Sequence, residues 1–196
     1  MRLGDRSTVL KTPRLTLRRA VMEDVEAFHR VFSDPAAMSY WSTLPHSTLS
    51  ETKDWVADMV AATEAGLSED FVVECDGRVI GKAGFWRPPE IGYILHPDYW
   101  GKGLASEAVQ AVLSHAFGPM ALQCVTADVD PRNQASLRLL ARHGFIETRR
   151  ASKTWKIGET WADSVYLALS PAAYAAARAS AASSASKASS GVSTAI

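Results

Sequence analysis

The stretch DYWGKGLASEA, residues 98–108, places two glycines directly before a run of residues that favour a helix. Gly101 and Gly103 carry no side chain, so a ligand can come close to the backbone there. The free N–H groups and the positive dipole end of the following helix attract anions. This arrangement suits a pyrophosphate. Taken in isolation, the stretch also fits a tight turn in which glycine serves conformation alone.

Two familiar nucleotide-binding motifs fit this stretch poorly. GKGLAS resembles the start of GxGxxG, but Ser106 stands where the third glycine or alanine is expected. The strands before it are predicted to form hairpins, whereas a dinucleotide-binding unit opens with a parallel strand-helix-strand. A Walker A loop requires a glycine five residues before Gly101, and that residue is His96. A dinucleotide oxidoreductase therefore remains only a distant alternative.

Hydrophobic periodicity on both sides of this stretch predicts an alternation of strands and helices. The predicted strands are 14–20, 70–75, 78–86, 90–95, 122–129, one near 145–148, and 164–170. The predicted helices are 22–32, 47–66, 104–117 and 133–144. Asp76-Gly77 favours a type I′ hairpin turn, so three consecutive antiparallel strands are expected between residues 70 and 95.

Composition and length favour one domain. The chain has 196 residues, 47% of them hydrophobic, which suits a single core. Residues 1–12 are expected to be a lead-in, 13–170 the domain, and 171–196 a disordered tail with helical structure only near Tyr174, because the last segment is nearly all Ala and Ser.

The charge balance and the cysteine content limit which partners, compartment and metal ligands are expected. Lys and Arg together balance Asp and Glu, 21 to 21, so we expect no nucleic-acid or membrane partner. The N-terminus lacks an apolar signal region, which predicts a cytoplasmic protein. Cys75 and Cys124 lie in apolar runs without CxxC spacing, so they are expected to be buried thiols, and no metal is predicted.

Four motifs, in this order, resemble the GNAT superfamily of acyl-CoA-dependent N-acetyltransferases, in particular its RimJ/RimL-like branch. They are TPRLTLRRAVMEDVEAF, VIGKAGFW, EIGYILHPDYWGKGLASEA and DVDPRNQASLRLLARHGFIE, and the resemblance spans about residues 13–170. It implies an α/β fold of the α+β type, with a mixed, largely antiparallel central sheet flanked by helices. It also implies acetyl-CoA as co-substrate and a primary amine as acceptor.

The resemblance assigns the coenzyme site. The family's pyrophosphate loop falls on residues 100–105, and Trp100 replaces the Gln or Arg of the general consensus. Backbone amides are implied as donors at Gly101, Lys102, Gly103, Leu104, Ala105 and Ser106. The N–H group of Leu95 is expected to polarise the thioester carbonyl. Asn133 is expected both to cap a helix and to contact the coenzyme.

The same resemblance assigns the general acid and the general base less fully than it assigns the coenzyme site. Many GNAT enzymes carry a tyrosine that protonates the leaving thiolate, and Leu140 occupies that position here. Ser136 lies one helical turn earlier on the same face and is the candidate acid, as a serine is in RimL-like enzymes. Glu90 is the candidate general base, since the family often places a glutamate on this strand; a solvated charge at a strand end is the alternative.

The acceptor is expected to bind between two aromatic segments, 33–46 and 152–161. The predicted contacts are Tyr40, Trp41, Trp155 and Trp161. Such walls suit a protein N-terminus and a small-molecule amine equally well. Because both cysteines lie away from the motifs, we expect the amine to attack the thioester directly in a ternary complex. The protein is expected to be a monomer or a homodimer. A non-catalytic acyl-CoA-binding or regulatory module is the alternative function.

Overall fold

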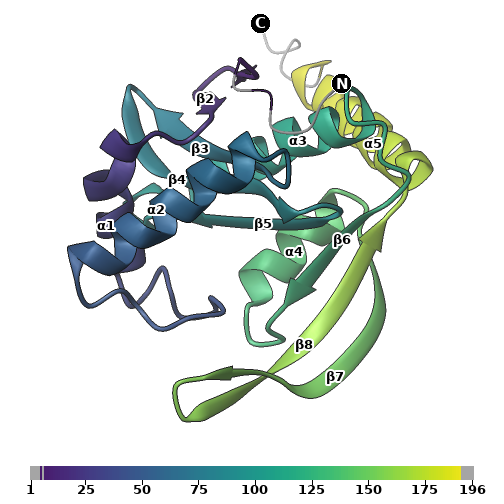
Figure 1. The fold of residues 1–196 in the computed structure, drawn as a ribbon. Coiled ribbons are helices and arrows are strands. Elements are labelled where there is room, and N and C mark those ends of the chain that lie inside the picture. Colours follow the sequence, from purple (N-terminus) through teal and green to yellow (C-terminus); the bar gives the residue numbers. More distant parts are fainter. Residues whose placement is uncertain (1–4, 6, 191–196) are drawn as a thin grey trace, which may run out of the picture.

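The computed structural model describes residues 5 and 7–190, with side chains described as far as residue 183. One eight-stranded sheet has the order β1-β2-β3-β4-β5-β6-β8-β7 (Figure 1). Its strands are β1 (Leu10–Lys11), β2 (Leu15–Arg18), β3 (Glu69–Cys75), β4 (Arg78–Arg87), β5 (Glu90–Leu95), β6 (Val125–Val129), β7 (Ile146–Ile157) and β8 (Thr160–Leu169). The helices are α1 (Val25–Phe32), α2 (Leu49–Glu64), α3 (Leu104–Phe117), α4 (Gln134–Arg142) and α5 (Pro171–Ser190), with 3-10 turns at Met22–Asp24 and Pro97–Tyr99. The predicted fold class is confirmed.

The first five strands pair antiparallel in chain order, and the last three of them, β3 to β5, are the three antiparallel strands that the sequence predicted. Asp76 and Gly77 join β3 to β4 with φ angles of 49° and 72°, the positive values that a type I′ turn requires. The predicted lead-in is not separate from the domain, because its Leu10 and Lys11 pair with β2 as an edge strand. Residues 1–4 and 6 lie outside the described residues.

Strands β5 and β6 run parallel but pair at one position only, Glu90 with Thr126. Beyond that pair β5 continues to pair with β4, and β6 pairs with β8 along its whole length. The sheet is therefore open between the later parts of β5 and β6. In Figure 1 the two strands diverge at the middle of the molecule.

Helices cover both faces of the sheet (Figure 1). α1 and α2 pack on one face through a core that includes Phe28, Phe32 and Met59. α3 and α4 pack on the other face, where Val109, Leu113 and Leu140 are among the buried residues. The opening between β5 and β6 therefore lies between two layers of helices.

The β7–β8 hairpin is longer than the sequence predicted. Two short strands were expected with a loop between them, but β7 and β8 pair from Ile146 to Ile157 and project beyond the sheet. A register irregularity between Ala151 and Trp155 interrupts the alternation of the ladder, and Lys153 there has φ 55°. Because the bulge interrupts the alternation of side chains, the sequence did not show the period of two by which a strand is recognised.

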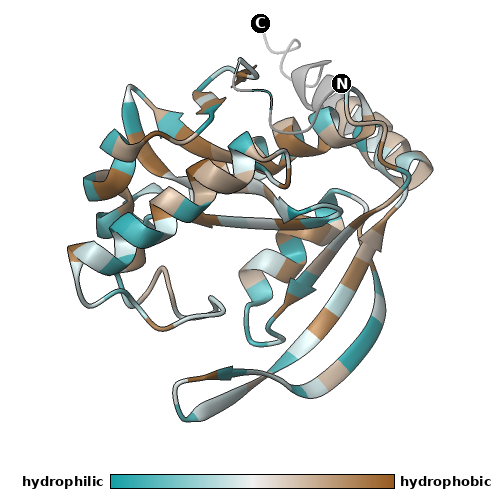
Figure 2. Cartoon of the chain, viewed as in Figure 1, coloured by the Kyte–Doolittle hydropathy of each residue, from teal (hydrophilic) through white to brown (hydrophobic). Residues whose placement is uncertain are grey.

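Residues Pro171–Ser190 form a helix, α5, in the segment where a tail with helical structure near Tyr174 was expected. In Figure 2 the described turns of α5 have mostly pale, intermediate colours. Its composition is neither strongly apolar nor strongly polar, so it did not indicate that this segment packs on the domain. Tyr174 is nonetheless 6% exposed and belongs to the main core. Its hydroxyl contacts Gln110 and lies 2.8 Å from Oγ of Ser114 on α3. Residues 191–196 lie outside the described part.

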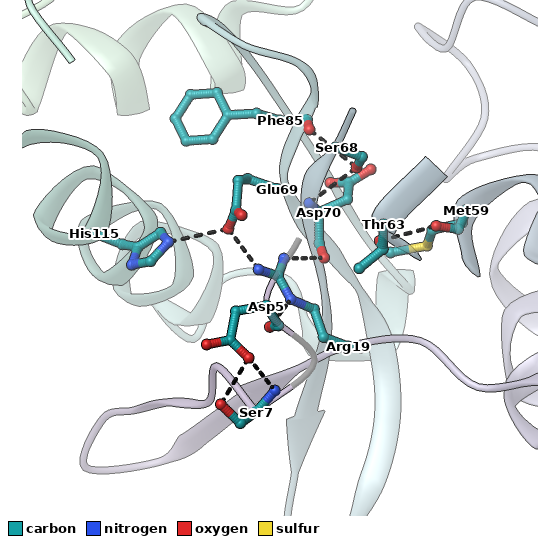
Figure 3. Close-up of polar contacts among 10 residues, drawn as sticks. All are labelled: Asp5, Ser7, Arg19, Met59, Thr63, Ser68, Glu69, Asp70, Phe85 and His115. Carbon is teal, nitrogen blue, oxygen red and sulfur yellow. Dashed lines mark hydrogen bonds and ion pairs between the residues drawn. The ribbon is translucent and has the colours of Figure 1, made fainter. Parts of the chain in front are cut away.

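A buried ionic cluster links the N-terminal segment, β3 and α3 (Figure 3). The Arg19 guanidinium donates to Oε2 of Glu69 at 2.6 Å, and Nε2 of His115 lies 3.1 Å from the same oxygen. Arg19 also donates to the carbonyl oxygen of Asp70 and stacks over the Phe71 ring at 4.2 Å. These contacts compensate the burial of the Glu69 carboxylate at the start of β3. The two cysteines are half-buried, which corrects the expectation of buried thiols.

Candidate active site

A cleft of about 990 Å³ opens between β5 and β6 and extends to the N-terminus of α3, to α4, to the loop before α2 and to the β7–β8 hairpin. Twelve of the predicted site residues line it. They are Tyr40, Trp41, Glu90, Leu95, Gly101, Gly103, Leu104, Ala105, Ser106, Asn133, Ser136 and Trp155. The remaining two, Lys102 and Trp161, have side chains directed elsewhere, as described below.

The two-glycine turn is open toward the cleft. Gly101 and Gly103 have φ angles of 72° and 77°, so both use the left-handed region that favours glycine. Gly103 caps α3 without a side-chain hydrogen bond, which leaves the first N–H groups of a 14-residue helix available to an anion. The Lys102 side chain turns back and donates to the carbonyl oxygen of Asp98 at 2.8 Å. Only the backbone of Lys102 can serve in the predicted role.

Two side chains hold this turn in place. The Arg14 guanidinium donates to the carbonyl oxygen of Lys102 at 2.8 Å and to Oε2 of Glu107 at 2.6 Å. At the other end, Oγ of Ser106 lies 3.0 Å from Nε2 of His143, whose pKa is lowered by burial and by the nearby Arg142. The turn is therefore preorganised rather than loose.

The pairing of β5 determines which of its N–H groups face the cleft. The N–H of His96 donates to the carbonyl oxygen of Ile80, and antiparallel pairing alternates along the strand. Residues 92 and 94 therefore direct their N–H groups to β4, and Leu95 directs its own toward the opening. The carbonyl of Leu95 accepts a 2.8 Å hydrogen bond from the Trp100 indole, so the divergent Trp100 braces the end of this strand.

The N-terminus of α4 forms another wall. Oδ1 of Asn133 accepts from the N–H of Ser136 at 3.0 Å, which is the N-cap geometry expected from the sequence. Oγ of Ser136 lies 2.7 Å from the Tyr93 hydroxyl on β5. Burial raises the pKa of Tyr93 to about 12. Leu140 also lines the cleft, but its hydrocarbon side chain supplies no polar group.

Glu90 lies at the point where β5 and β6 begin to separate. Partial burial and the negative charge of Asp128 raise the pKa of Glu90 above its usual value. Asp128 accepts a 2.9 Å hydrogen bond from the Trp155 indole on the hairpin. Glu90 and Asp128 therefore both line the cleft, and Asp128 is bonded to the hairpin.

The acceptor end has aromatic walls, but not the full predicted set. Trp155 is paired directly with Ala162, and both line the cleft. Trp161 is paired with Lys156, one position along the hairpin, and is 50% exposed outside the cleft. Because side chains alternate between the faces of a strand, Trp161 faces away from Trp155, and its predicted role is withdrawn.

A buried lysine accompanies the aromatic wall, and the sequence reasoning did not single it out. Lys82 on β4 forms an ion pair with Asp70, and both side chains are nearly inaccessible. Its Nζ lies 5.5 Å from the ring centroids of both Trp41 and Trp55. Tyr93 and Asp128 were also missed, although each lies within a quoted motif. The signal that could have identified them was the alternation of side-chain direction along β5 and β6.

The open pair of strands beside a phosphate-type turn agrees with a direct comparison. Residues 14–146 match the family described as "Acetyltransferase (GNAT) domain". The chain belongs to the GNAT family of acetyltransferases. It is an acetyl-CoA-dependent N-acetyltransferase, and both the predicted family and the predicted enzymatic class are confirmed.

Among curated GNAT relatives, the uncharacterized N-acetyltransferase p20 of Bacillus licheniformis is 36% identical over 145 residues, which cover 69% of this chain and 81% of that protein. Solved structures agree. A GNAT-family acetyltransferase from Bacillus anthracis is 29% identical, with a TM-score of 0.73 over 83% of this chain and 98% of its own. Mycobacterium smegmatis RimJ in complex with CoA-disulfide has a TM-score of 0.75 at 23% identity, covering 87% and 90%, which shows a shared fold.

No helix within residues 7–190 combines the length and the apolar character that crossing a bilayer would require.

Proposed function

We propose that this GNAT enzyme acetylates a primary amine by direct attack within a ternary complex formed in the cleft between β5 and β6. The observation that carries the proposal is the separation of these strands beyond Glu90 and Thr126, beside the two-glycine turn. The cleft gives an acyl-thioester arm access to unpaired backbone groups. The turn gives the phosphates of the same molecule a site at the helix N-terminus.

The coenzyme would lie along the predicted residues. Backbone N–H groups from Gly101 to Ser106 would hold the pyrophosphate, and Asn133 would contact the coenzyme while capping α4. The N–H of Leu95 would donate to the thioester oxygen, which becomes more negative as the amine attacks. The exposed guanidinium of Arg142 lines the same cleft and adds positive charge near the phosphates.

Proton transfers would be divided between two walls. Glu90 would accept the proton of the attacking amine through water, and its raised pKa makes it a stronger base than an ordinary glutamate. Ser136 would donate its hydroxyl proton to the leaving sulfur. Cys75 and Cys124 both lie outside the cleft, which favours direct transfer over a covalent acyl-enzyme.

The acceptor would enter between Tyr40, Trp41 and Trp155. This opening suits a protein N-terminal α-amine, as the RimJ/RimL-like resemblance suggests, and it also suits a small-molecule amine. A panel of N-terminal peptides and small amines, assayed for acetyl transfer, would separate the two classes. A cytoplasmic monomer or homodimer remains the expected form.

A matched pair of variants at Gly101 tests the coenzyme site. An added Cβ at Gly101 meets no described atom within 4 Å, and Asn and Asp both tolerate the left-handed region. Gly101→Asn therefore controls for backbone effects, while Gly101→Asp adds a negative charge facing the phosphates. Acetyl-CoA at several hundred times its Kd should stabilise the wild type by about 3 to 4 kcal/mol.

The expected outcome is that Gly101→Asn retains much of this stabilisation and Gly101→Asp loses it, with parallel losses in acetyl transfer. Equal stabilisation of both variants by acetyl-CoA would show that the phosphates bind elsewhere. No stabilisation of the wild type would remove the proposed site altogether.

A further inference from the structure

The hydroxyl groups of Tyr93 and Ser136 meet across the cleft wall at 2.7 Å. Tyr93 comes from β5, two residues before Leu95, and Ser136 comes from the first turn of α4. Both side chains line the cleft. The contact therefore joins the strand proposed to hold the thioester to the helix proposed to protonate the leaving sulfur.

Either hydroxyl could donate in this contact, and the two directions have different consequences for Ser136. A serine hydroxyl accepts through its lone pairs while donating its single hydrogen elsewhere. The pKa of Tyr93, raised by burial to about 12, keeps the phenol protonated and able to donate over the whole working pH range. If Tyr93 donates to Oγ of Ser136, the Ser136 hydrogen is left free to turn into the cleft.

We infer that Tyr93 is a positioning residue, whose hydroxyl donates to Oγ of Ser136 and directs the Ser136 hydrogen at the leaving sulfur. This inference rests on the proposed function. It also accounts for a feature of the sequence: the tyrosine expected on α4 is replaced by the buried Leu140, and a phenol reaches the same helix from β5 instead.

The proton balance assigns Tyr93 no proton loss. The C–N bond forms, the C–S bond breaks, and its electron pair goes to sulfur, which takes the Ser136 hydrogen. A serine hydroxyl is a weaker acid than a phenol, so Oγ regains a hydrogen from cleft water in the same step and no alkoxide forms. The proton that the amine released to Glu90 returns to that water and completes the balance. A thiol has a pKa of about 8.5, far below that of this phenol, so Tyr93 keeps its own proton and only positions Ser136.

Kinetics of single and double variants test the inference. Tyr93→Phe keeps the ring and removes one oxygen, and we expect kcat to fall about fivefold to tenfold, the loss typical of one hydrogen bond, with KM for acetyl-CoA unchanged. Ser136→Ala should cost more. The double variant should cost no more than Ser136→Ala alone, because Tyr93 acts through Ser136. Tyr166→Phe, on β8 and outside the cleft, is the matched control and should leave kcat unchanged.

A titration without turnover provides a second readout. The thiol pKa of enzyme-bound CoA can be followed by the ultraviolet absorbance of its thiolate. A directed Ser136 hydroxyl stabilises the thiolate, so both Ser136→Ala and Tyr93→Phe should raise this thiol pKa. Tyr166→Phe should not. Melting curves would confirm that Tyr93→Phe remains folded.

Two results would overturn the inference. One is an unchanged thiol pKa in Tyr93→Phe; the other is an equal loss of kcat from Tyr93→Phe in the wild-type and Ser136→Ala backgrounds. Failure of the proposed function is distinguishable. A wild type that binds CoA but acetylates no amine would end that proposal, while the thiol titration would still decide the role of Tyr93.

Discussion

Trp155 and Asp128 are joined by a 2.9 Å hydrogen bond from the indole Nε1 to Oδ2, which ties the β7–β8 hairpin to strand β6 at the edge of the cleft. The turn of the hairpin also lies close to the loop before α2, since a Cβ added at Gly158 would be 3.4 Å from Leu44. The hairpin therefore forms a braced wall at the acceptor end. Asp128 has a second effect, because its charge raises the pKa of Glu90.

Trp155→Phe should weaken acceptor binding without affecting the coenzyme. Phenylalanine keeps an aromatic surface but cannot donate to Asp128, so the hairpin loses its connection to β6. We expect KM for the acceptor to rise about fivefold, equivalent to one hydrogen bond, while Kd for acetyl-CoA stays constant. Trp161→Phe, on the opposite face of the hairpin, should leave both constants unchanged. A larger effect at Trp161 than at Trp155 would contradict the placement of the hairpin.

The pH dependence of kcat/KM should report Glu90. A base acts only in its ionised form, so activity should rise with pH through the raised pKa of Glu90. Asp128→Asn removes the neighbouring negative charge, lowers the pKa of Glu90 and should shift this limb to lower pH. Asparagine still accepts from Trp155 through its side-chain oxygen. Glu90→Gln should abolish the limb, and persistence of the limb in that variant would exclude Glu90 as the base.

Tyr174 should make α5 necessary for full stability. Tyr174→Phe removes the hydroxyl that contacts Ser114 and Gln110 and should cost about 1 kcal/mol in the free energy of unfolding. Tyr174→Ala also removes the buried ring and should cost about 3 kcal/mol. Deletion from Pro171 onward should destabilise at least as much, measured by urea unfolding. An unaffected deletion variant would restore the description of this segment as a tail.

Arg19→Met should be among the more destabilising single substitutions. It leaves the carboxylate of Glu69 buried without the guanidinium that now contacts it at 2.6 Å. Breaking a buried pair from one side typically costs about 3 to 5 kcal/mol. Arg150→Ala provides the contrast, because the pair of Arg150 with Glu147 is exposed and should contribute little to the measured stability. Comparable losses of unfolding free energy in the two variants would show that the cluster in Figure 3 contributes no more to stability than an exposed ion pair.

Local signals in the sequence predicted most elements and the anion-binding turn. The predicted helix 104–117 coincides with α3, since its start follows from glycines that must adopt positive φ and its end from Gly118. Predicted strand 90–95 coincides with β5, because alternation and the preceding prolines are local features. The motif order placed Ser136, Asn133 and the glycines in one site, and the structure brings them to one cleft.

The length of the β7–β8 hairpin and the packing of α5 were not predicted, for a different reason. The bulge near Lys153 breaks the period of β7, and the Ala/Ser composition of α5 conceals a single anchoring side chain. Whether Tyr174 is buried depends on a pocket made by α3, more than fifty residues away in the sequence. Tyr174 and its partners on α3 are too far apart in the sequence for a local pattern to reveal their contact.

The sequence by itself determined the fold class, the family resemblance and the phosphate-type turn, because periodicity, glycine conformation and motif order are properties of short segments. Only the tertiary structure decided the separation of β5 from β6, the opposite facings of Trp155 and Trp161, and the contact between Tyr93 and Ser136. Each of these depends on strand register and on packing between distant segments. A shift of one residue in register would reverse every side chain on the strand, and only the assembled core selects the register.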